Sequence, residues 1–226
     1  MSEYENLRGG KLFDPSDPVL KEIKLRAHLL SQDYNRLQET EAEKRSTILQ
    51  KLLSHIGKNT FLQGPIIFHY GVHTEIGNNC FVNFNFTVQD DAPVRIGDCC
   101  NFGPNVTIVT PLHPMLAEER NALKYTDGTV HRLCYAKPVS IGSNCWFGAN
   151  VVVCPGVTIG ENCVIGAGSV VTHDIPVGAF AAGNPCRVIR MLSENDSVFN
   201  LPNILSTDMQ TSGNLIKTND SAGKAL

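Results

Sequence analysis

The side chain in this chain best suited to acid–base chemistry is His113, which lies in the run Thr110-Pro111-Leu112-His113-Pro114. Imidazole has an ordinary pKa of about 6.5, so a neutral histidine can take a proton from a hydroxyl group at neutral pH. His113 is therefore a candidate general base. The alternative is an ordinary histidine in a surface loop, and the choice depends on what the fold brings beside it.

A six-residue period indicates the elements that must position this histidine. An α-helix repeats its apolar face every 3.6 residues and a simple strand every two, so neither explains a sustained period of six. A parallel β-helix does, because each hexad supplies a short strand and a turn, and three hexads close one coil. The apolar series is Ile141, Phe147, Val153, Ile159, Ile165 and Val171, and two residues ahead of it run Val139, Cys145, Val151, Val157, Cys163 and Ser169.

A coil of 18 residues predicts which side chains stack. The phrase Ile-Gly-x-Asn-Cys occurs at 76–80, 141–145 and 159–163, and in a weaker form at 96–100. We therefore expect Ile141 to stack on Ile159, and Cys145 on Cys163, inside a mainly β fold. The cysteines of this phrase then serve as small apolar side chains that face the interior.

The period is interrupted in two places. Ile76 and Ile96 are 20 residues apart instead of 18, so two residues must bulge outward, and the polar run 89–93 with Asp91 is the expected position. The period then stops at about residues 111–138. This stretch predicts a long excursion loop that opens beside His113, and long loops in compact folds are often functional.

The segments outside the coil have other patterns. Residues 1–60 are expected to form a helical N-terminal cap, with one helix that begins at Asp17 and Pro18 as N-cap and first residue. A second helix is expected at about 39–55, ended by Gly57. Residues 61–192 are expected to form the coil domain, and the polar tail 193–226 is expected to be disordered because it has little apolar surface.

Composition narrows the classes of function. The net charge of −3 gives no reason to expect nucleic acid or a membrane surface as a partner. No apolar run approaches the roughly 18 residues that span a bilayer, and the N-terminus does not resemble a secretory signal. We therefore expect a cytoplasmic protein whose eight cysteines stay reduced. No Cys-x-x-Cys pair indicates a zinc site.

The order of several motifs resembles the hexapeptide-repeat acyltransferases, and among them the galactoside and maltose acetyltransferases. The resemblance covers about residues 7–192 and implies a left-handed parallel β-helix, a handedness that the spacing itself does not determine. The motifs are Asn83-Phe84-Asn85-Phe86-Thr87, Asp90-Asp91, Leu112-His113-Pro114, Cys145-Trp146-Phe147-Gly148-Ala149, Gly166-Ala167-Gly168-Ser169 and Gly183-Asn184-Pro185-Cys186-Arg187-Val188-Ile189-Arg190.

The resemblance assigns roles on the acceptor side. It makes His113 the catalytic base and puts Asn83 and Asp91 in the acceptor pocket. His69 also falls on an acceptor contact, where the family usually has Ser or Asp. Asp14 is the acidic residue nearest to an N-terminal acceptor contact, although strict alignment places Pro15 there.

On the coenzyme side, the resemblance implies that acetyl-CoA is the co-substrate and that no metal is required. Trp146 either walls the pantetheine channel or packs in the core, and His173 stands where the family commonly has Lys. The remaining expected contacts with coenzyme A are Ala149, Ala167, Thr172, Arg187 and Arg190. The implied reaction is direct transfer of an acetyl group to a sugar hydroxyl at sites between the chains of a homotrimer.

Three alternatives remain open. The first is a zinc-dependent carbonic anhydrase, for which His69, His73 and His113 are the plausible ligands. The second is a non-catalytic β-helix scaffold, which coenzyme A binding would exclude. The third is acetylation of a non-sugar amine or a serine hydroxyl on the same fold, because acceptor loops vary easily.

Overall fold

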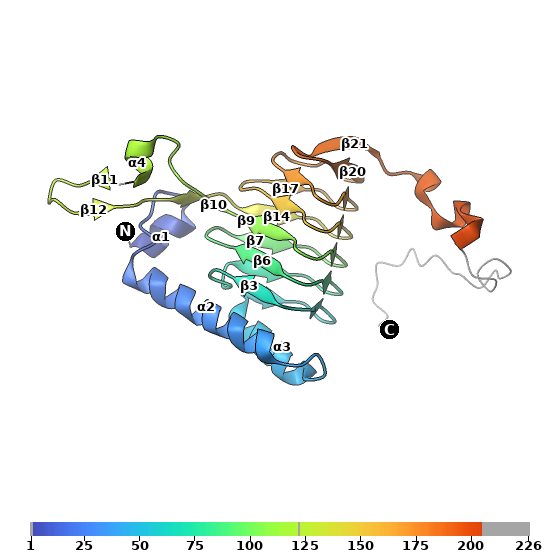
Figure 1. The fold of residues 1–226 in the computed structure, drawn as a ribbon, viewed down its shortest axis with the longest axis horizontal. Coiled ribbons are helices and arrows are strands. Elements are labelled where there is room, and N and C mark those ends of the chain that lie inside the picture. The colour runs from blue at the N-terminus through green and yellow to red at the C-terminus, as the bar shows by residue number, and fades with distance from the viewer. Residues whose placement is uncertain (1, 122, 205–226) are drawn as a thin grey trace. The chain divides into compact units, whose positions relative to one another are not determined.

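A parallel β-helix occupies the centre of residues 1–190 in the computed structural model, which describes residues 2–121 and 123–204 (Figure 1). Each coil adds one short strand to each of three parallel sheets, so the coil is a prism with three faces. Helices of the N-terminal segment cover its lower end. This architecture confirms the predicted β-helix with N-terminal capping helices.

The three faces are named here in the order in which the chain crosses them. The first face consists of β1 (His55–Ile56), β4 (Thr74–Ile76), β7 (Val94–Ile96), β14 (Val139–Ile141) and β17 (Thr158–Ile159). The second face consists of β2 (Phe61–Leu62), β5 (Phe81–Val82), β8 (Asn101–Phe102), β15 (Trp146–Phe147), β18 (Val164–Ile165), β20 (Ala179–Ala182) and β21 (Arg187–Met191). The third face consists of β3 (Ile66–Phe68), β6 (Phe86–Gln89), β9 (Thr107–Val109), β16 (Val152–Val153) and β19 (Val170–Val171).

Register between the coils follows the predicted spacing. Ile141 pairs with Ile159, and Trp146 pairs with Val164, which places Cys145 over Cys163. Ile76 pairs with Ile96, 20 residues away, so the early coils hold two extra residues as predicted. The strands have one buried and one outward-facing series, and the buried series forms the continuous apolar core of the prism.

At two of its three corners the coil makes tight turns, and in many coils an asparagine occupies the turn. Asn79, Asn144 and Asn162 have φ between 55° and 61°, the left-handed region that asparagine tolerates better than most residues. Close packing of coils also requires glycine, since a Cβ on Gly142 would lie 2.6 Å from the amide nitrogen of Glu161. The repeated Gly-x-Asn thus encodes a turn that can pack closely against the equivalent turn of the next coil.

The stacked cysteines have a polar contact in addition to their apolar packing. Cys80, Cys145 and Cys163 are buried, as predicted, and all eight cysteines are free. The Sγ atom of Cys145 lies 3.1 Å from the carbonyl oxygen of Gly160, and that of Cys80 lies 3.2 Å from the carbonyl oxygen of Gly97. Each thiol can therefore donate to the turn of the coil above it.

Three helices precede the coil: α1 (Glu3–Arg8), α2 (Pro18–Arg36) and α3 (Ala42–Leu52). Asp17 caps α2 through bonds from the amides of Val19 and Leu20, which confirms the predicted helix start. The predicted end of the second helix at Gly57 is wrong. His55 and Ile56 instead form strand β1, because they pair with Glu75 and Ile76 of the next coil.

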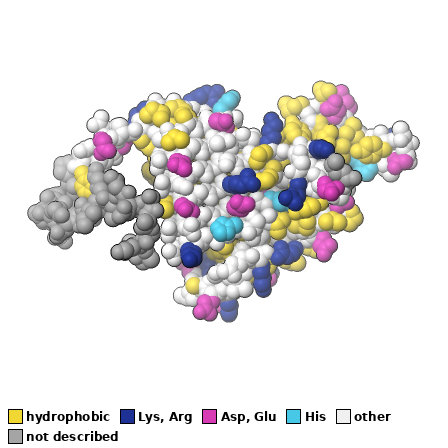
Figure 2. Space-filling view, turned by 180° about the vertical axis from the view of Figure 1, so that it is seen from behind, with side chains coloured by type: hydrophobic (Ala, Val, Ile, Leu, Met, Phe, Trp, Pro, Cys, Tyr) yellow, Lys and Arg dark blue, Asp and Glu magenta, His cyan; other side chains and the backbone are white. Residues whose placement is uncertain are grey.

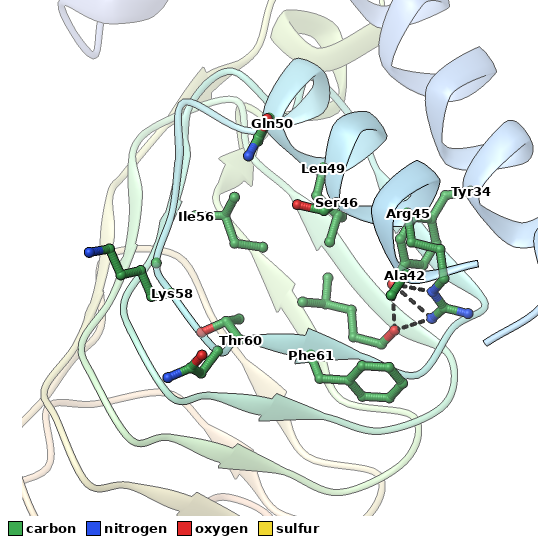
Figure 3. Close-up of a pocket in the computed structure, with 13 residues that line it drawn as sticks. Tyr34, Ala42, Arg45, Ser46, Leu49, Gln50, Ile56, Lys58, Thr60 and Phe61 are labelled. Carbon is green, nitrogen blue, oxygen red and sulfur yellow. Dashed lines mark hydrogen bonds between the residues drawn. The ribbon is translucent and has the colours of Figure 1, made fainter. Parts of the chain in front are cut away.

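The cap satisfies backbone groups that the first coil would otherwise leave unpaired. Asn35 both donates to the carbonyl of Ile66 and accepts from its amide, each at 2.8 Å. The buried Arg45 donates to Tyr34 Oη and to the carbonyls of Leu62 and Gln63. Figure 3 shows this guanidinium beside a cavity of about 480 Å³ between α3 and the first coil.

The outer surfaces of the faces differ in chemistry. The first face carries the ion pair of Glu75 with Arg95, 3.7 Å apart, and is otherwise polar. Seen from behind, side chains of both charge signs are interspersed over the coil, whereas hydrophobic side chains gather near the excursion loop and the N-terminal helices (Figure 2). The outward residues of the third face are Ile67, Thr87, Thr107, Val152 and Val170.

The excursion loop at residues 111–138 has more structure than the sequence predicts. Strand β10 (Pro111–Leu112) pairs antiparallel with β13 (Tyr135–Ala136), and these two strands close the base of the loop. Helix α4 (Ala117–Asn121) and the pair β11 (Leu123–Lys124) and β12 (Val130–His131) lie between them. The loop is therefore anchored at its base by backbone hydrogen bonds.

The second unit begins at Met191, and its described part contains three short 3-10 helices: η1 (Glu194–Asp196), η2 (Val198–Asn200) and η3 (Pro202–Ile204). Residues 193–204 thus have local structure that the prediction of a disordered tail did not include. The remainder of that prediction, residues 205–226, lies outside the described residues. None of the described helices is long and apolar enough to cross a membrane.

Candidate active site

The extra residues of the early coils all leave the prism at one corner, where the chain passes from the third face to the first. Residues 69–73, here called the lower bulge, connect β3 to β4, and residues 90–93, the upper bulge, connect β6 to β7. The predicted bulge with Asp91 is thus confirmed, and the lower bulge was missed. The excursion loop leaves at the same corner one coil higher, directly after β9.

Asp90 and Thr110 connect these three segments. The fully buried carboxylate of Asp90 accepts from the amides of Tyr70 and His73 at 2.8 and 3.3 Å and from Thr74 Oγ1 at 2.9 Å. Thr110 Oγ1 donates to the carbonyl of Gln89 and accepts from the amide of Ala92. The bulges and the base of the loop therefore form one hydrogen-bonded layer, which orients Asp91.

One carboxylate oxygen of Asp91 is buried without a hydrogen-bond partner. The residue is 3% exposed, and its Oδ2 atom makes no hydrogen bond. Burial, with a smaller contribution from the neighbouring Asp90 charge, raises the pKa of Asp91 to about 6. A buried carboxylate with an unpaired acceptor oxygen lowers the stability of the folded state, and such groups cluster at functional sites.

The N-terminal helix α2 contributes a wall to this corner. The His69 ring lies 5.6 Å from the ring of His28, and Lys24 Nζ lies 5.9 Å from the ring centroid of Tyr70. Burial, and then the charges of Lys24 and His28, lower the pKa of His69 to about 4, so His69 is neutral at neutral pH. Lys24 and Tyr70 were missed as site residues. Lys24 lies four residues after the buried Leu20 and three before the buried Ala27, so helical spacing places it on the packed side of α2.

His113 is exposed and follows β10 directly, at the base of the excursion loop. The pairing of Pro111 with Ala136 and of Leu112 with Tyr135 sets the direction of the chain just before it. The structure thus brings His113, Asp91 and His69 to the same corner, on successive coils. A basic side chain above a buried carboxylate is an arrangement suited to binding a hydroxyl group and removing its proton.

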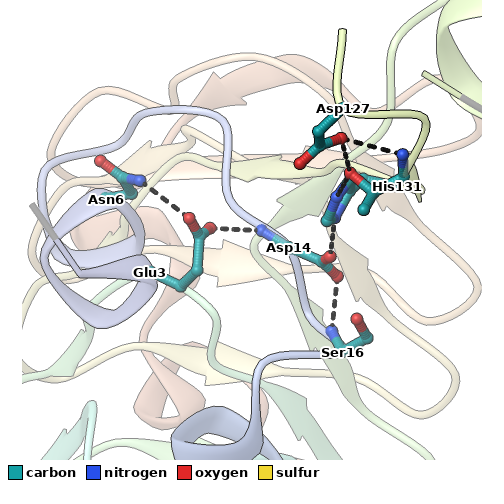
Figure 4. A network of polar contacts seen from close by, with 7 residues as sticks. Glu3, Asn6, Asp14, Ser16, Asp127 and His131 are labelled. Atoms are coloured by element: carbon teal, nitrogen blue, oxygen red, sulfur yellow. Dashed lines mark hydrogen bonds and ion pairs between the residues drawn. The ribbon is translucent and has the colours of Figure 1, made fainter. Parts of the chain in front are cut away.

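Asp14 is engaged with the excursion loop (Figure 4). Its Oδ2 lies 2.6 Å from His131 Nδ1, and its Oδ1 accepts from the amide of Ser16. Burial raises the pKa of Asp14, but the hydrogen bonds from His131 and Ser16 outweigh it and hold this pKa below its usual value. An antiparallel bridge between Phe13 and Cys134 reinforces the contact. The expected acceptor contact at Asp14 is thus occupied by His131, which no sequence signal indicated.

The other predicted residues lie at different places on the coil. Asn83, Ala149 and Ala167 all follow second-face strands, so they occupy the corner between the second and third faces. Asn83 Oδ1 accepts from the amide of Phe84 at 2.8 Å. Trp146 is 57% exposed on the outer side of the second face, which excludes the core-packing alternative.

The last coil and the segment after it carry the remaining coenzyme candidates. Thr172 and His173 are exposed just beyond β19, with Thr172 Oγ1 2.9 Å from His173 Nδ1. Arg187 and Arg190 are exposed on β21, and the Arg190 guanidinium lies 5.6 Å from the ring centroid of Phe180. Within one chain, the width of the third face separates Asn83, Ala149 and Ala167 from the corner of Asp91 and His113.

Metal ligation finds no support in the described part of the chain. No group of three or more His, Cys, Asp or Glu side chains within it is placed to hold a metal ion. In particular, His73 is committed to the bulge, with its Nδ1 atom 2.7 Å from the carbonyl oxygen of Asp90. The trio His69, His73 and His113 therefore does not form the ligand set that a carbonic anhydrase would need.

Comparison with known proteins agrees with this geometry. Residues 8–57 match the maltose acetyltransferase hexapeptide capping motif, and residues 138–173 match the hexapeptide repeat of succinyl-transferase. Galactoside O-acetyltransferase of Escherichia coli is 42% identical over 87% of this chain and 92% of its own length. The galactoside O-acetyltransferase of Lactococcus lactis is 37% identical over 87% of this chain and 91% of its own length.

Solved structures are similar over the same region. A galactoside acetyltransferase in complex with coenzyme A superposes with a TM-score of 0.79 at 42% identity, covering 87% of this chain and 94% of that one. A maltose O-acetyltransferase from Clostridium difficile gives the same TM-score at 40% identity, covering 86% and 99%. The chain therefore belongs to the hexapeptide-repeat acetyltransferases, in the branch of the galactoside and maltose O-acetyltransferases. It is an acetyltransferase.

The burial of Asp91 predicts a pH-dependent stability. Because its pKa is about 6 in the folded chain and ordinarily 3.8, folding opposes its ionisation, and stability falls as pH rises from about 4 through 6. The substitution Asp91→Asn removes this loss of stability, because an amide does not ionise. We expect the variant to be more stable than wild type by about 1–3 kcal/mol at pH 7.5, with a much smaller difference at pH 4, as measured by urea unfolding at equal protein concentration.

The matched control is Glu119→Gln, a substitution of an exposed carboxylate in α4, which should change stability little at either pH. An Asp91→Asn protein that is equally stable to wild type at pH 7.5, or less stable, would show that Asp91 ionises without cost.

Proposed function

We propose that this acetyltransferase transfers the acetyl group of acetyl-CoA to a hydroxyl group of a sugar, with His113 as the general base. The observation that carries the proposal is the joint placement of His113 and the buried Asp91 at the corner where both bulges and the excursion loop leave the coil. One hydroxyl group of a sugar can donate a hydrogen bond to the carboxylate of Asp91, while an adjacent hydroxyl group donates to the imidazole of His113. The names of the relatives support the same class of acceptor.

The reaction needs no covalent intermediate on the protein. A sugar hydroxyl is a weak nucleophile, so His113 removes its proton as the oxygen attacks the thioester carbonyl. The oxyanion that develops needs a preorganised donor, and the backbone N–H of Ala149 is the proposed one. As the tetrahedral species collapses, the ester C–O bond remains and the C–S bond breaks. The thiolate of coenzyme A leaves and takes the proton from His113.

The positions of the two half-sites support a shared site between chains. His113 and Asp91 lie at one edge of the third face, and Ala149 and Ala167 lie at its other edge. In a homotrimer whose third faces surround the threefold axis, the edge that carries His113 and Asp91 in one chain meets the edge that carries Ala149 and Ala167 in the next. The aliphatic and β-branched outer surface of the third face suits such an interior position, and the charged first face then points to solvent.

Replacement of His113 tests the proposed chemistry. His113→Ala should lower kcat for acetyl transfer by about 10²–10⁴, the usual contribution of a general base, and should leave the Kd for coenzyme A nearly unchanged. The assay follows thiol release with a panel of sugars, amines and serine as acceptors. His55→Ala is the matched control, because His55 is exposed on the first face and away from the site.

Retention of more than about a tenth of the wild-type rate by His113→Ala would exclude it as the base. Faster release of thiol with an amine or with serine than with any sugar would contradict the proposed acceptor.

A charge on the third face tests the proposed assembly. Val152 faces outward on β16, between β9 and β19 of that face, so Val152→Arg should place unpaired charges around the threefold axis and dissociate the trimer. Sedimentation should show a trimer for wild type and monomers for the variant, with loss of acetyl transfer. Ser140→Arg makes the same change on the first face and should remain trimeric. A trimeric Val152→Arg protein would show that the third face does not form the interface.

A further inference from the structure

One charged network joins the excursion loop to the N-terminal segment (Figure 4). His131, the last residue of β12, lies at its centre, and its two ring nitrogens have different partners. Nδ1 lies 2.6 Å from Asp14 Oδ2, and Nε2 lies 2.9 Å from Thr129 Oγ1. The side chains of His131 and Asp14 are 29% and 14% exposed, so the contact between them is largely withdrawn from solvent.

The partners of His131 determine how many protons its ring carries. The Thr129 hydroxyl lies 2.6 Å from Asp127 Oδ1 and donates its hydrogen to that carboxylate, so it can only accept from Nε2. Asp14 also only accepts, because hydrogen bonds outweigh burial and hold its pKa below the usual value. Both ring nitrogens therefore donate, and His131 is an imidazolium. The groups that face it are Asp14 from the N-terminal segment and, from its own hairpin, Asp127 and the ring of Tyr125, whose centroid is 4.7 Å away.

A second connection runs beside this contact and leads to the corner that carries His113. Phe13 and Cys134 exchange two backbone hydrogen bonds, of 2.9 and 3.0 Å. Cys134 directly precedes β13, and β13 pairs with β10, the strand that ends one residue before His113. The N-terminal segment therefore holds β13, and β13 holds the chain just before His113.

A small apolar core lies beside the same connection. Phe13 and Cys134 are buried in a cluster separate from the core of the prism, together with Leu7 of α1, Leu20 of α2 and Tyr70 of the lower bulge. This cluster thus joins the loop to the N-terminal helices and to the coil. The charged network borders it, since the carboxylate of the network follows Phe13 directly and the imidazolium precedes Cys134 by three residues.

We propose that His131 is a positioning residue for His113: as an imidazolium bound to Asp14 it holds the excursion loop against the N-terminal segment, and the paired strands β13 and β10 pass this constraint to His113. The inference rests on the proposed role of His113 as the base. His113 is exposed and follows a strand of 2 residues, which by itself gives little support. A base must stay within hydrogen-bond reach of its hydroxyl, and a misplacement of about 1 Å can lower a rate by about 10²-fold.

Hydrogen exchange tests the connection without relying on activity. His131→Ala should speed exchange of the amides of Phe13 and Cys134 by about tenfold, since a hydrogen bond between charged groups is lost. His131→Arg keeps the cation and its donors and should preserve their protection. Lys44→Ala is the matched control, because it removes an ion pair of similar length, 2.8 Å, to Glu41 beside α3. Wild-type protection of both amides in His131→Ala would overturn the proposal.

Kinetics test the step from the loop to the base. His131→Ala should lower kcat for acetyl transfer by about 10- to 100-fold. The Kd for coenzyme A should stay unchanged, which also shows that the variant is folded. In that background Asp14→Ala should have almost no further effect on kcat, and full additivity of the two effects would contradict the proposal. A wild-type kcat in His131→Ala would contradict it as well.

The pH profile separates an imidazolium from a neutral contact. In wild type, kcat should fall at acid pH as His113 gains a proton, and at alkaline pH as His131 loses one. Because arginine stays charged, His131→Arg should keep the acid fall and lose the alkaline one. The same alkaline profile in both proteins would overturn the role of the imidazolium. If His113→Ala retains activity, the proposed base fails, while hydrogen exchange still decides the contact of His131 with Asp14.

Discussion

The backbone hydrogen bonds between successive coils are the constraint on which the rest of this structure depends. Each strand must meet the strand above it in register, as Ile141 meets Ile159, so a coil has no freedom to absorb an additional residue within a strand. Additional residues can leave only at a corner. In this chain they leave at the corner between the third and first faces, and the candidate site lies there.

The same constraint explains why the site is costly to maintain. The bulges carry polar groups that lie outside the strand pairing, and the side chains of Asp90 and Thr110 bond to several of them. Asp91 is left buried with a raised pKa, in a wall that also holds a neutral His69 and the cation of Lys24. Stability is thus lower at neutral pH than a fully paired corner would allow, which is typical of sites arranged for chemistry.

The sequence predicts the parts of this fold that depend on local or periodic rules. The stacking of Cys145 over Cys163 follows from an 18-residue coil, and the start of α2 follows from the capping preference of Asp17. The helix end at Gly57 could not be predicted, because pairing of His55 with Glu75 overrides the local signal. The contact of Asp14 with His131 joins residues 117 positions apart and has no periodic signature. The burial of Asp91 likewise depends on three segments that meet only in the fold.

In the proposed trimer, one chain supplies His113 and Asp91, while its neighbour supplies Asn83 and the coenzyme contacts. The most direct measurement is acetyl transfer by mixed trimers of His113→Ala chains and Ala167→Trp chains, in which Ala167 is exposed at the corner between the second and third faces. Each variant should be inactive alone. Every mixed trimer should contain one intact site and show acetyl transfer. Verified mixed trimers without activity would contradict the account and place the complete site within one chain.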